Sequence, residues 1–199
     1  MSATYDKTEG YTAPPFGRRL YLTSYDPGRR VSREDAFCVI DFETTGFTPA
    51  TAEVIEFAAV RVRGGELGLN LASLCAPTVP ITPEITRVNG IDNAMVEGYP
   101  PFGELLPLLL DFIGEDIIAA HNASFDMSFL KAYCERAGIE LEPRVFCTLT
   151  AARQLYAELP SKRLGEVAAH LGVDGTGYHR ALADATVTAK VLVEMLKTI

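Results

Sequence analysis

Residues 36–46 of the chain read AFCVIDFETTG, an apolar run that ends in two acids, two threonines and a glycine. A short, β-branched run closed by a glycine-containing turn is typical of a buried strand. Alternate residues of a strand face the same way, so Asp41 and Glu43 project from one face, a few ångströms apart. Two like charges this close raise a pKa unless a cation lies between them, and a divalent metal meets that need. The alternative is an ordinary pair of polar residues where a strand meets solvent.

The segments that follow predict an α/β fold with a mixed sheet. Strands are expected at 54–62 and 67–75, which form an antiparallel meander with the first strand. A further strand is expected at 117–120, and a short segment at 84–89 ends at Gly90. Ser124 is expected to cap a helix that ends near Gly138. The helices are expected at 102–112, 124–137, 148–159, 164–171 and 181–197.

Composition limits the class of protein. The chain has 199 residues, 48% of them hydrophobic, which is enough for one domain with a substantial core, with or without an extension. No apolar run is long enough to span a membrane, and no secretory signal is evident. The four cysteines are far apart, which favours reduced thiols in a cytosolic protein. The net charge of −8 argues against tight nonspecific binding to nucleic acid, but not against an enzyme that reaches phosphate through bound metals.

Residues 1–35 have no hydrophobic period and are expected to form an irregular N-terminal extension. Within 17–33 there are five arginines and one acid, Asp26. An arm that contacts DNA or a partner is one interpretation. A surface extension wrapped on the domain is the favoured one.

Two further acidic stretches bear on the site. Residues 121–126 read HNASFD and place Asp126 in the first turn of a helix, where an acid also simply complements the helix dipole. Residues 178–184 read YHRALAD and place Asp184 about one turn into the last helix, five residues after His179. A solvent-exposed loop histidine is the alternative for His179. Together with Asp41 and Glu43 these residues supply four carboxylates and one base, a set that can bridge two divalent ions ~4 Å apart. Oxygen ligands suit Mg²⁺ or Mn²⁺, whereas no cysteine or histidine cluster suits zinc.

These three stretches resemble the three motifs of the DEDDh family of exonucleases, which includes the proofreading epsilon subunit of bacterial DNA polymerase III. The likeness covers about residues 36–197, and all five catalytic positions are filled. It implies an RNase H-like fold, with a mixed five-stranded sheet flanked by helices, in an exonuclease domain at 36–199. It also implies 3′→5′ exonucleolysis that releases nucleoside 5′-monophosphates.

The resemblance assigns a role to each residue. Asp41, Glu43, Asp126 and Asp184 are expected to hold two Mg²⁺ or Mn²⁺ ions, and His179 is expected to be the general base. Phe47 is expected either to stack on a base or to belong to the core. Asn89 stands where the epsilon subunit carries a histidine. The residues expected at the terminal nucleotide are Thr44, Thr45, Phe47, Asn89, Asn122 and Phe125.

The function expected from these residues is hydrolysis at DNA 3′ ends, preferably single-stranded or frayed, in proofreading or repair in the cytoplasm. A DNA polymerase subunit is an expected partner. Epsilon subunits usually continue into a polymerase-binding tail, whereas this sequence stops at Ile199, so a stand-alone or differently tethered exonuclease is favoured over a dedicated polymerase III proofreader. An RNA-trimming exoribonuclease with the same chemistry is the nearest competing interpretation. A catalytically silent polymerase-binding domain and a small-molecule phosphodiesterase are less favoured.

Overall fold

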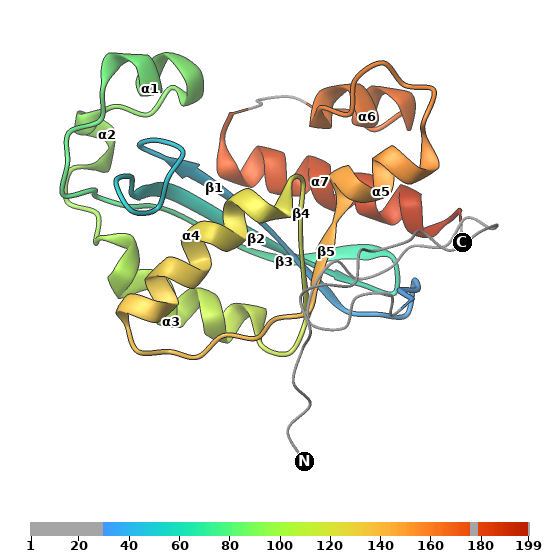
Figure 1. Ribbon diagram of the computed structural model, residues 1–199, viewed down its shortest axis with the longest axis horizontal. Helices are drawn as coiled ribbons and strands as arrows, with labels where there is room; N and C mark the ends of the chain where they lie inside the picture. Colours follow the sequence, from blue (N-terminus) through green and yellow to red (C-terminus); the bar gives the residue numbers. More distant parts are fainter. Residues whose placement is uncertain (1–29, 176–178, 199) are drawn as a thin grey trace, which may run out of the picture.

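A five-stranded mixed sheet forms the centre of the computed structural model, which describes residues 30–175 and 179–198 (Figure 1). The strand order is β3-β2-β1-β4-β5. The first three strands pair antiparallel as a meander, and β4 and β5 continue the sheet in parallel with β1. The strands are β1 (Phe37–Thr44), β2 (Val54–Arg63), β3 (Glu66–Leu74), β4 (Ile117–Ala120) and β5 (Val145–Cys147). The expected α/β fold with a five-stranded mixed sheet is confirmed.

Helices cover both faces of this sheet (Figure 1). On one face α3 and α4 pack against the sheet, and on the other face α7 packs against β1 and β2 and is itself covered by α5 and α6. The short helices α1 and α2 pack on a separate small apolar cluster that includes Ile55 of β2. The helices are α1 (Pro83–Asn89), α2 (Asn93–Val96), α3 (Phe102–Ile113), α4 (Ala123–Arg136), α5 (Thr148–Leu155), α6 (Leu164–His170) and α7 (Ala181–Leu196).

The alternation of side chains along β1 decides which face the acids occupy. Phe37 and Val39 lie in the core that α7 covers, whereas Cys38 and Ile40 lie in the core that α3 and α4 cover. With a period of two, Asp41 and Glu43 continue the α7 side. The face on which β1 presents its acids is therefore the face against which the last helix packs.

Several expected boundaries differ from the structure. The first strand runs through the acidic residues to Thr44. The helix expected to reach 159 ends at Leu155, because Tyr156 leaves helical geometry and is buried. The expected cap at Ser124 is wrong: Asn122 is the N-cap, and Ser124 lies in the first turn with its hydroxyl donating to Asn122 Oδ1 at 3.2 Å. The strand β5 and the helix α2 were not expected individually, since three and four residues are too few to show a period.

The segment before β1 is described from Arg30 onward. Val31 is fully buried in the core on the α7 side of the sheet, and Arg33 is exposed. The interpretations that concern residues 1–29, including three of the five arginines, lie outside the described residues. Within the part that the structure describes, no helix has the length and apolar character needed to cross a bilayer.

Candidate active site

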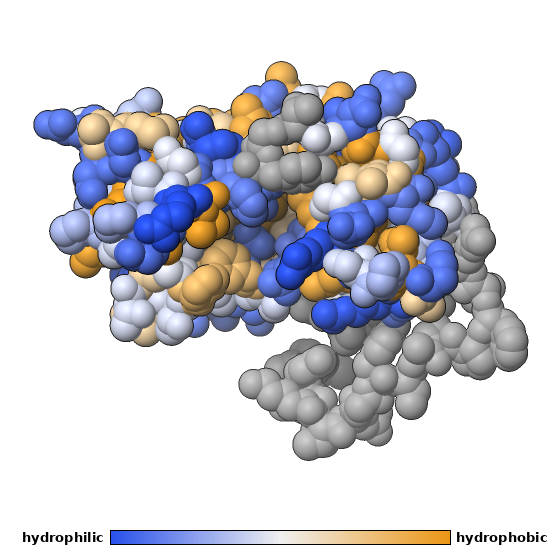
Figure 2. All heavy atoms as spheres, turned by 90° about the horizontal axis from the view of Figure 1, so that it is seen from above, coloured by the Kyte–Doolittle hydropathy of each residue, from blue (hydrophilic) through white to orange (hydrophobic). Residues whose placement is uncertain are grey.

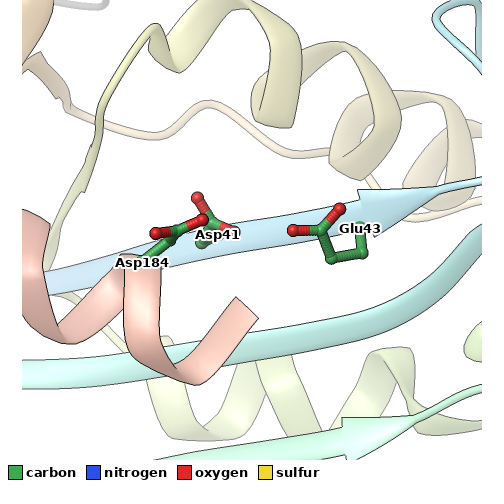
Figure 3. Close-up of side chains that lie close together, drawn as sticks. All are labelled: Asp41, Glu43 and Asp184. Atoms are coloured by element: carbon green, nitrogen blue, oxygen red, sulfur yellow. The ribbon is translucent and has the colours of Figure 1, made fainter. Parts of the chain in front are cut away.

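Three carboxylates from two elements meet beside the sheet (Figure 3). Asp41 and Glu43 project from β1, and Asp184 projects from the first turn of α7. One ligand oxygen of each lies within 4.8 Å of the others. The structure thus brings together residues from the first strand and the last helix.

Asp126 approaches the same place from α4. Because β1 and β4 are parallel, their carboxyl ends lie at the same edge of the sheet, and the chain passes from β4 into α4 at that edge. Asp126 is buried, and its Oδ1 accepts a hydrogen bond of 3.1 Å from the backbone N–H of Phe42. The fourth carboxylate therefore lies next to the other three, tied to the backbone between Asp41 and Glu43, and is not one of the three within 4.8 Å.

Burial and mutual repulsion hold the pKa values of all four carboxyl groups above their ordinary range. Burial is the largest cause throughout, and the charges of Asp126, Asp184 and Glu43 add to it for Asp41. The pKa of Glu43 rises to about 7 and that of Asp126 to about 8, while that of Asp184 is also raised. A site built this way retains protons until a cation replaces them.

The donor set fits a divalent metal. Asp184 Oδ1 is buried and has no hydrogen-bond partner among the described residues, although its Oδ2 accepts one. A buried carboxylate oxygen without a partner carries a desolvation cost that a metal ion removes. The three clustered groups offer oxygen ligands, which Mg²⁺ and Mn²⁺ prefer.

His179 lies at the entrance to α7, next to Asp184. Its backbone has a φ of 68°, and its N–H donates to Asp184 Oδ2 at 2.9 Å. The side chain is exposed and lines, with Asp184, a cavity of about 740 Å³. A left-handed backbone at a residue that is not glycine is uncommon and concentrates at functional sites. Residues 176–178, including Tyr178, lie outside the described chain.

The threonines after Glu43 shape the loop that follows β1. Thr44 Oγ1 donates to the carbonyl of Gly46 at 2.6 Å. Thr45 pairs with Glu53, because its N–H donates to the Glu53 carbonyl and its Oγ1 accepts the Glu53 N–H, both at 2.9 Å. The loop is therefore closed on itself and presents Phe47 outward. That ring is 88% exposed, so the expectation that Phe47 could belong to the core is wrong.

Asn89 makes a contact that the sequence did not suggest. Its Nδ2 donates to Glu43 Oε2 at 3.4 Å, and its Oδ1 accepts the N–H of Ile91 at 3.0 Å. Its side chain is buried and reaches the carboxylate from the end of α1. Asn89 thus orients Glu43 and, by donating to it, lowers its pKa against the effect of burial.

Asn122 and Phe125 lie where α4 begins. Asn122 is exposed and left-handed, with a φ of 71°. Phe125 is half-buried and lies with its ring centroid 5.2 Å from that of Phe129. Both are placed at the edge of the sheet where β1 and β4 end.

Glu56 and Arg180 form an ion pair that the sequence analysis missed. Glu56 of β2 lies opposite Glu43 of β1, so its side chain is on the same face of the sheet. That side chain is 8% exposed and contacts the start of α7. Both oxygens accept from the Arg180 guanidinium at 2.7 to 3.2 Å, and Oε2 also accepts the N–H of Ala181 at 2.9 Å. Glu56 therefore caps α7 from a neighbouring strand and fixes the helix turn that carries Asp184. An acid inside the apolar run 54–60 was the available signal.

Together, a mixed sheet and a carboxylate cluster formed by its central strand and a helix packed on it suit metal-assisted hydrolysis of a phosphodiester. The family model described as Exonuclease (RNase T) matches residues 38–192, a stretch that contains every site residue above. The chain belongs to this exonuclease family and is a hydrolase of nucleic acids.

Two curated relatives show how far the likeness extends. The chain is similar to the DNA polymerase III subunit epsilon of Aquifex aeolicus, with 38% identity over 82% of each chain. It is also 38% identical to the PolC-type DNA polymerase III of Clostridium perfringens, over 83% of this chain, but it spans only 11% of that polymerase.

Solved structures agree with the family. Exonuclease X in complex with 5′ overhanging duplex DNA matches 81% of this chain and 92% of that one, with a TM-score of 0.69 and 28% identity. Exonuclease I matches 82% of this chain and 41% of that one with a TM-score of 0.73, and at 21% identity it supports the fold alone. The RNase H-like fold and the resemblance to the epsilon-type exonucleases are confirmed.

Proposed function

We propose that the chain is a metal-dependent 3′→5′ exonuclease that removes nucleoside 5′-monophosphates from single-stranded or frayed DNA ends. The observation that carries the proposal is the cluster of Asp41, Glu43 and Asp184, whose oxygens lie within 4.8 Å. Asp184 Oδ1 is buried there without a hydrogen-bond partner among the described residues. Paired carboxylates whose protons a cation must displace suit phosphodiester hydrolysis better than any structural role.

The residues divide the chemistry between them. Asp41, Glu43 and Asp184 would hold Mg²⁺ or Mn²⁺, with Asp126 completing the set for a second ion. When bound, these ions supply Lewis acids for the attacking water and the leaving 3′ oxygen. His179, exposed at the rim beside Asp184, takes the proton of the water on an imidazole nitrogen.

The terminal nucleotide is held around this cluster. Thr44 and Thr45 form the loop that meets the terminal nucleotide, and the N–H of Thr45 is already donated to the Glu53 carbonyl, so it is not free for the 3′-OH. Asn122 and Phe125 lie beside its sugar and base, and the exposed ring of Phe47 stacks on a base. Asn89, bonded to Glu43, acts by orienting that carboxylate.

The relatives support a biological setting. Because one relative is an epsilon subunit and another is a PolC-type polymerase, we place the chain beside a DNA polymerase in proofreading or repair. Residues 36–199 are the exonuclease domain in this proposal, Val31 before them already packs in its core, and residues 1–29 lie outside the described residues. Four free, buried cysteines fit a reducing compartment such as the cytoplasm.

The test uses 5′-labelled single-stranded DNA and the matching RNA, incubated with the purified chain in Mg²⁺, Mn²⁺ or EDTA. We expect a ladder that shortens from the 3′ end of DNA, that disappears in EDTA and that collapses in His179→Ala and Asp184→Asn. His170→Ala and Asp174→Asn, which change an exposed histidine and an exposed acid outside the cluster, are the matched controls. Faster shortening of RNA would assign the chain to the RNA-trimming relatives, and no metal-dependent shortening of either strand would refute the proposal.

A further inference from the structure

A cavity of about 740 Å³ beside the carboxylate cluster is lined by three basic side chains and by Asp184. Asp184 and His179 line this cavity from the start of α7. The segment from α5 to α6 also lines it and carries Arg153, Lys162 and Arg163, which we call the basic wall. Figure 2 looks onto the molecule from above and shows a hollow whose border includes both hydrophilic and hydrophobic side chains. One acid, Glu166, also lines the cavity. In a chain with a net charge of −8, this is a local reversal of sign.

The basic wall is held in place by contacts that leave its arginines free. His121 Nε2 donates to the backbone carbonyl of Lys162 at 2.8 Å, and its Nδ1 lies 2.9 Å from Thr148 Oγ1. The Lys162 ammonium donates to the carbonyls of Ala157 and Leu159, so that cation is already used to close the connection.

The guanidinium groups of Arg153 and Arg163, by contrast, have no hydrogen bond and no ion pair within residues 30–175 and 179–198. Both side chains are exposed. An anchored backbone that presents two unpaired guanidinium groups is pre-organised for an anion, because little ordering remains to be done on binding.

The basic wall continues away from the carboxylates. A second hollow of about 300 Å³ shares Leu149 and Arg153 with the first, and it adds Lys131 and the loop residue Asn122. The two hollows therefore form a continuous path. It begins beside Asp184, passes the basic side chain of Arg153 and reaches that of Lys131. A repeating anion, one charge per unit along a chain, matches a path of this kind better than a single small anion does.

We propose that the basic wall binds the backbone phosphates of the strand on the 5′ side of the scissile bond, with Arg153 and Arg163 as the principal contacts. The inference rests on the proposed function, since it takes the reacting phosphate to lie at Asp41, Glu43 and Asp184. Guanidinium groups bind phosphate oxygens through paired, charge-assisted hydrogen bonds. They carry no base information there, so the strand is held regardless of its sequence. The basic wall also offsets the repulsion that the carboxylates exert on an incoming strand.

The experiment separates binding of the strand from hydrolysis. The variant is Arg153→Gln with Arg163→Gln, which keeps two polar side chains in place. Its control is Arg33→Gln with Lys190→Gln, which removes the same charge from exposed positions outside the cavity. Binding of a fluorescently labelled single strand is followed by anisotropy in EDTA over a range of salt. Hydrolysis is followed with the p-nitrophenyl ester of thymidine 5′-monophosphate, which has no phosphate upstream of its scissile bond.

We expect the Kd of the strand to rise about tenfold or more in the basic-wall variant, and the slope of log Kd against log salt to fall by about 1.4 for two lost phosphate contacts. Hydrolysis of the ester is expected to change less than about twofold, because it needs only the reacting site. Unchanged strand binding, an equal loss in the control variant, or a parallel loss of ester hydrolysis would each overturn the inference. Failure of the unaltered chain to hydrolyse the ester in Mg²⁺ or Mn²⁺ would count against the proposed function instead, while the anisotropy would still decide on the basic wall.

Discussion

The ion pair between Glu56 and Arg180 gives the sharpest prediction, because it joins the fold to the site. Replacing Glu56 by Gln removes the charge but keeps the shape of a side chain that is 8% exposed. The carboxylate accepts three contacts from the guanidinium and one from the N–H of Ala181. Hydrogen bonds to charged groups contribute about 1.5–3 kcal/mol each when a buried partner is lost. Arg180 is 44% exposed and regains water, so we expect a net loss of about 2 kcal/mol.

For a chain of this length that loss lowers the Tm by about 4–8 °C. Arg180→Gln is expected to lower it as well, since the buried Glu56 then loses its counterion. Differential scanning calorimetry at neutral pH measures both changes. A Tm that stays within about 1 °C of the unaltered chain in both variants would refute the role of the pair in holding α7.

The two variants are expected to act in opposite directions on the pH dependence of activity. The charge of Glu56 raises the pKa of Asp41, Glu43 and Asp184, so its removal lowers those pKa values and moves the acid limb of kcat/KM to lower pH. The charge of Arg180 lowers the pKa of Glu43, so its removal moves the limb to higher pH. Rates on the thymidine ester, measured below both unfolding transitions, test this. A shift of the limb in the same direction in both variants would show that the pair acts on the fold alone.

Three further predictions concern single features of the site. In EDTA the Tm should fall as pH rises from ordinary carboxyl pKa values to the raised pKa of about 7 for Glu43 and about 8 for Asp126, because the folded state binds more protons than the unfolded one. Added Mg²⁺ should remove this fall, which calorimetry measures. A Tm that rises over the same pH range in EDTA would contradict the prediction. Asn89→Ala should weaken Mn²⁺ binding several-fold, since Glu43 loses a hydrogen-bond donor and its pKa rises. The same variant should lose about 1–3 kcal/mol of stability, because the Ile91 N–H loses its acceptor. Unchanged metal titrations and unchanged denaturant midpoints would contradict these two expectations. Phe47→Ala should leave stability within about 0.5 kcal/mol but raise the KM for a single strand about tenfold, and an unchanged KM would exclude base stacking there.

The parts of the structure that follow from local patterns were accessible in the sequence. The period of two along β1 placed Asp41 and Glu43 on one face, and the turn at Gly64 and Gly65 gave the meander. The meeting of Asp184 with these acids came from the resemblance to a family, since no local pattern brings residues so far apart together. In the structure one oxygen of each of the three carboxylates lies within 4.8 Å of the others.

The remaining features depend on tertiary contacts. The tie between Asp126 and the Phe42 N–H follows from how α4 crosses the edge of the sheet. The capping of α7 by Glu56 depends on the register of β2 beside β1 and on the packing of the helix. The exposure of Phe47 depends on the closure of its loop by Thr45 and Glu53, and an aromatic residue in sequence alone is equally compatible with a core.

The most direct test of the metal-dependent mechanism is a titration of Mn²⁺ followed by electron paramagnetic resonance, with thymidine 5′-monophosphate present as the product. We expect two ions per chain, with binding that strengthens as pH rises through the raised pKa values of the carboxyl groups. Asp184→Asn should lose at least one ion, whereas Asp174→Asn should bind as the unaltered chain does. Mn²⁺ binding that is absent, or that is the same in Asp184→Asn as in the unaltered chain, would contradict the assignment of the site.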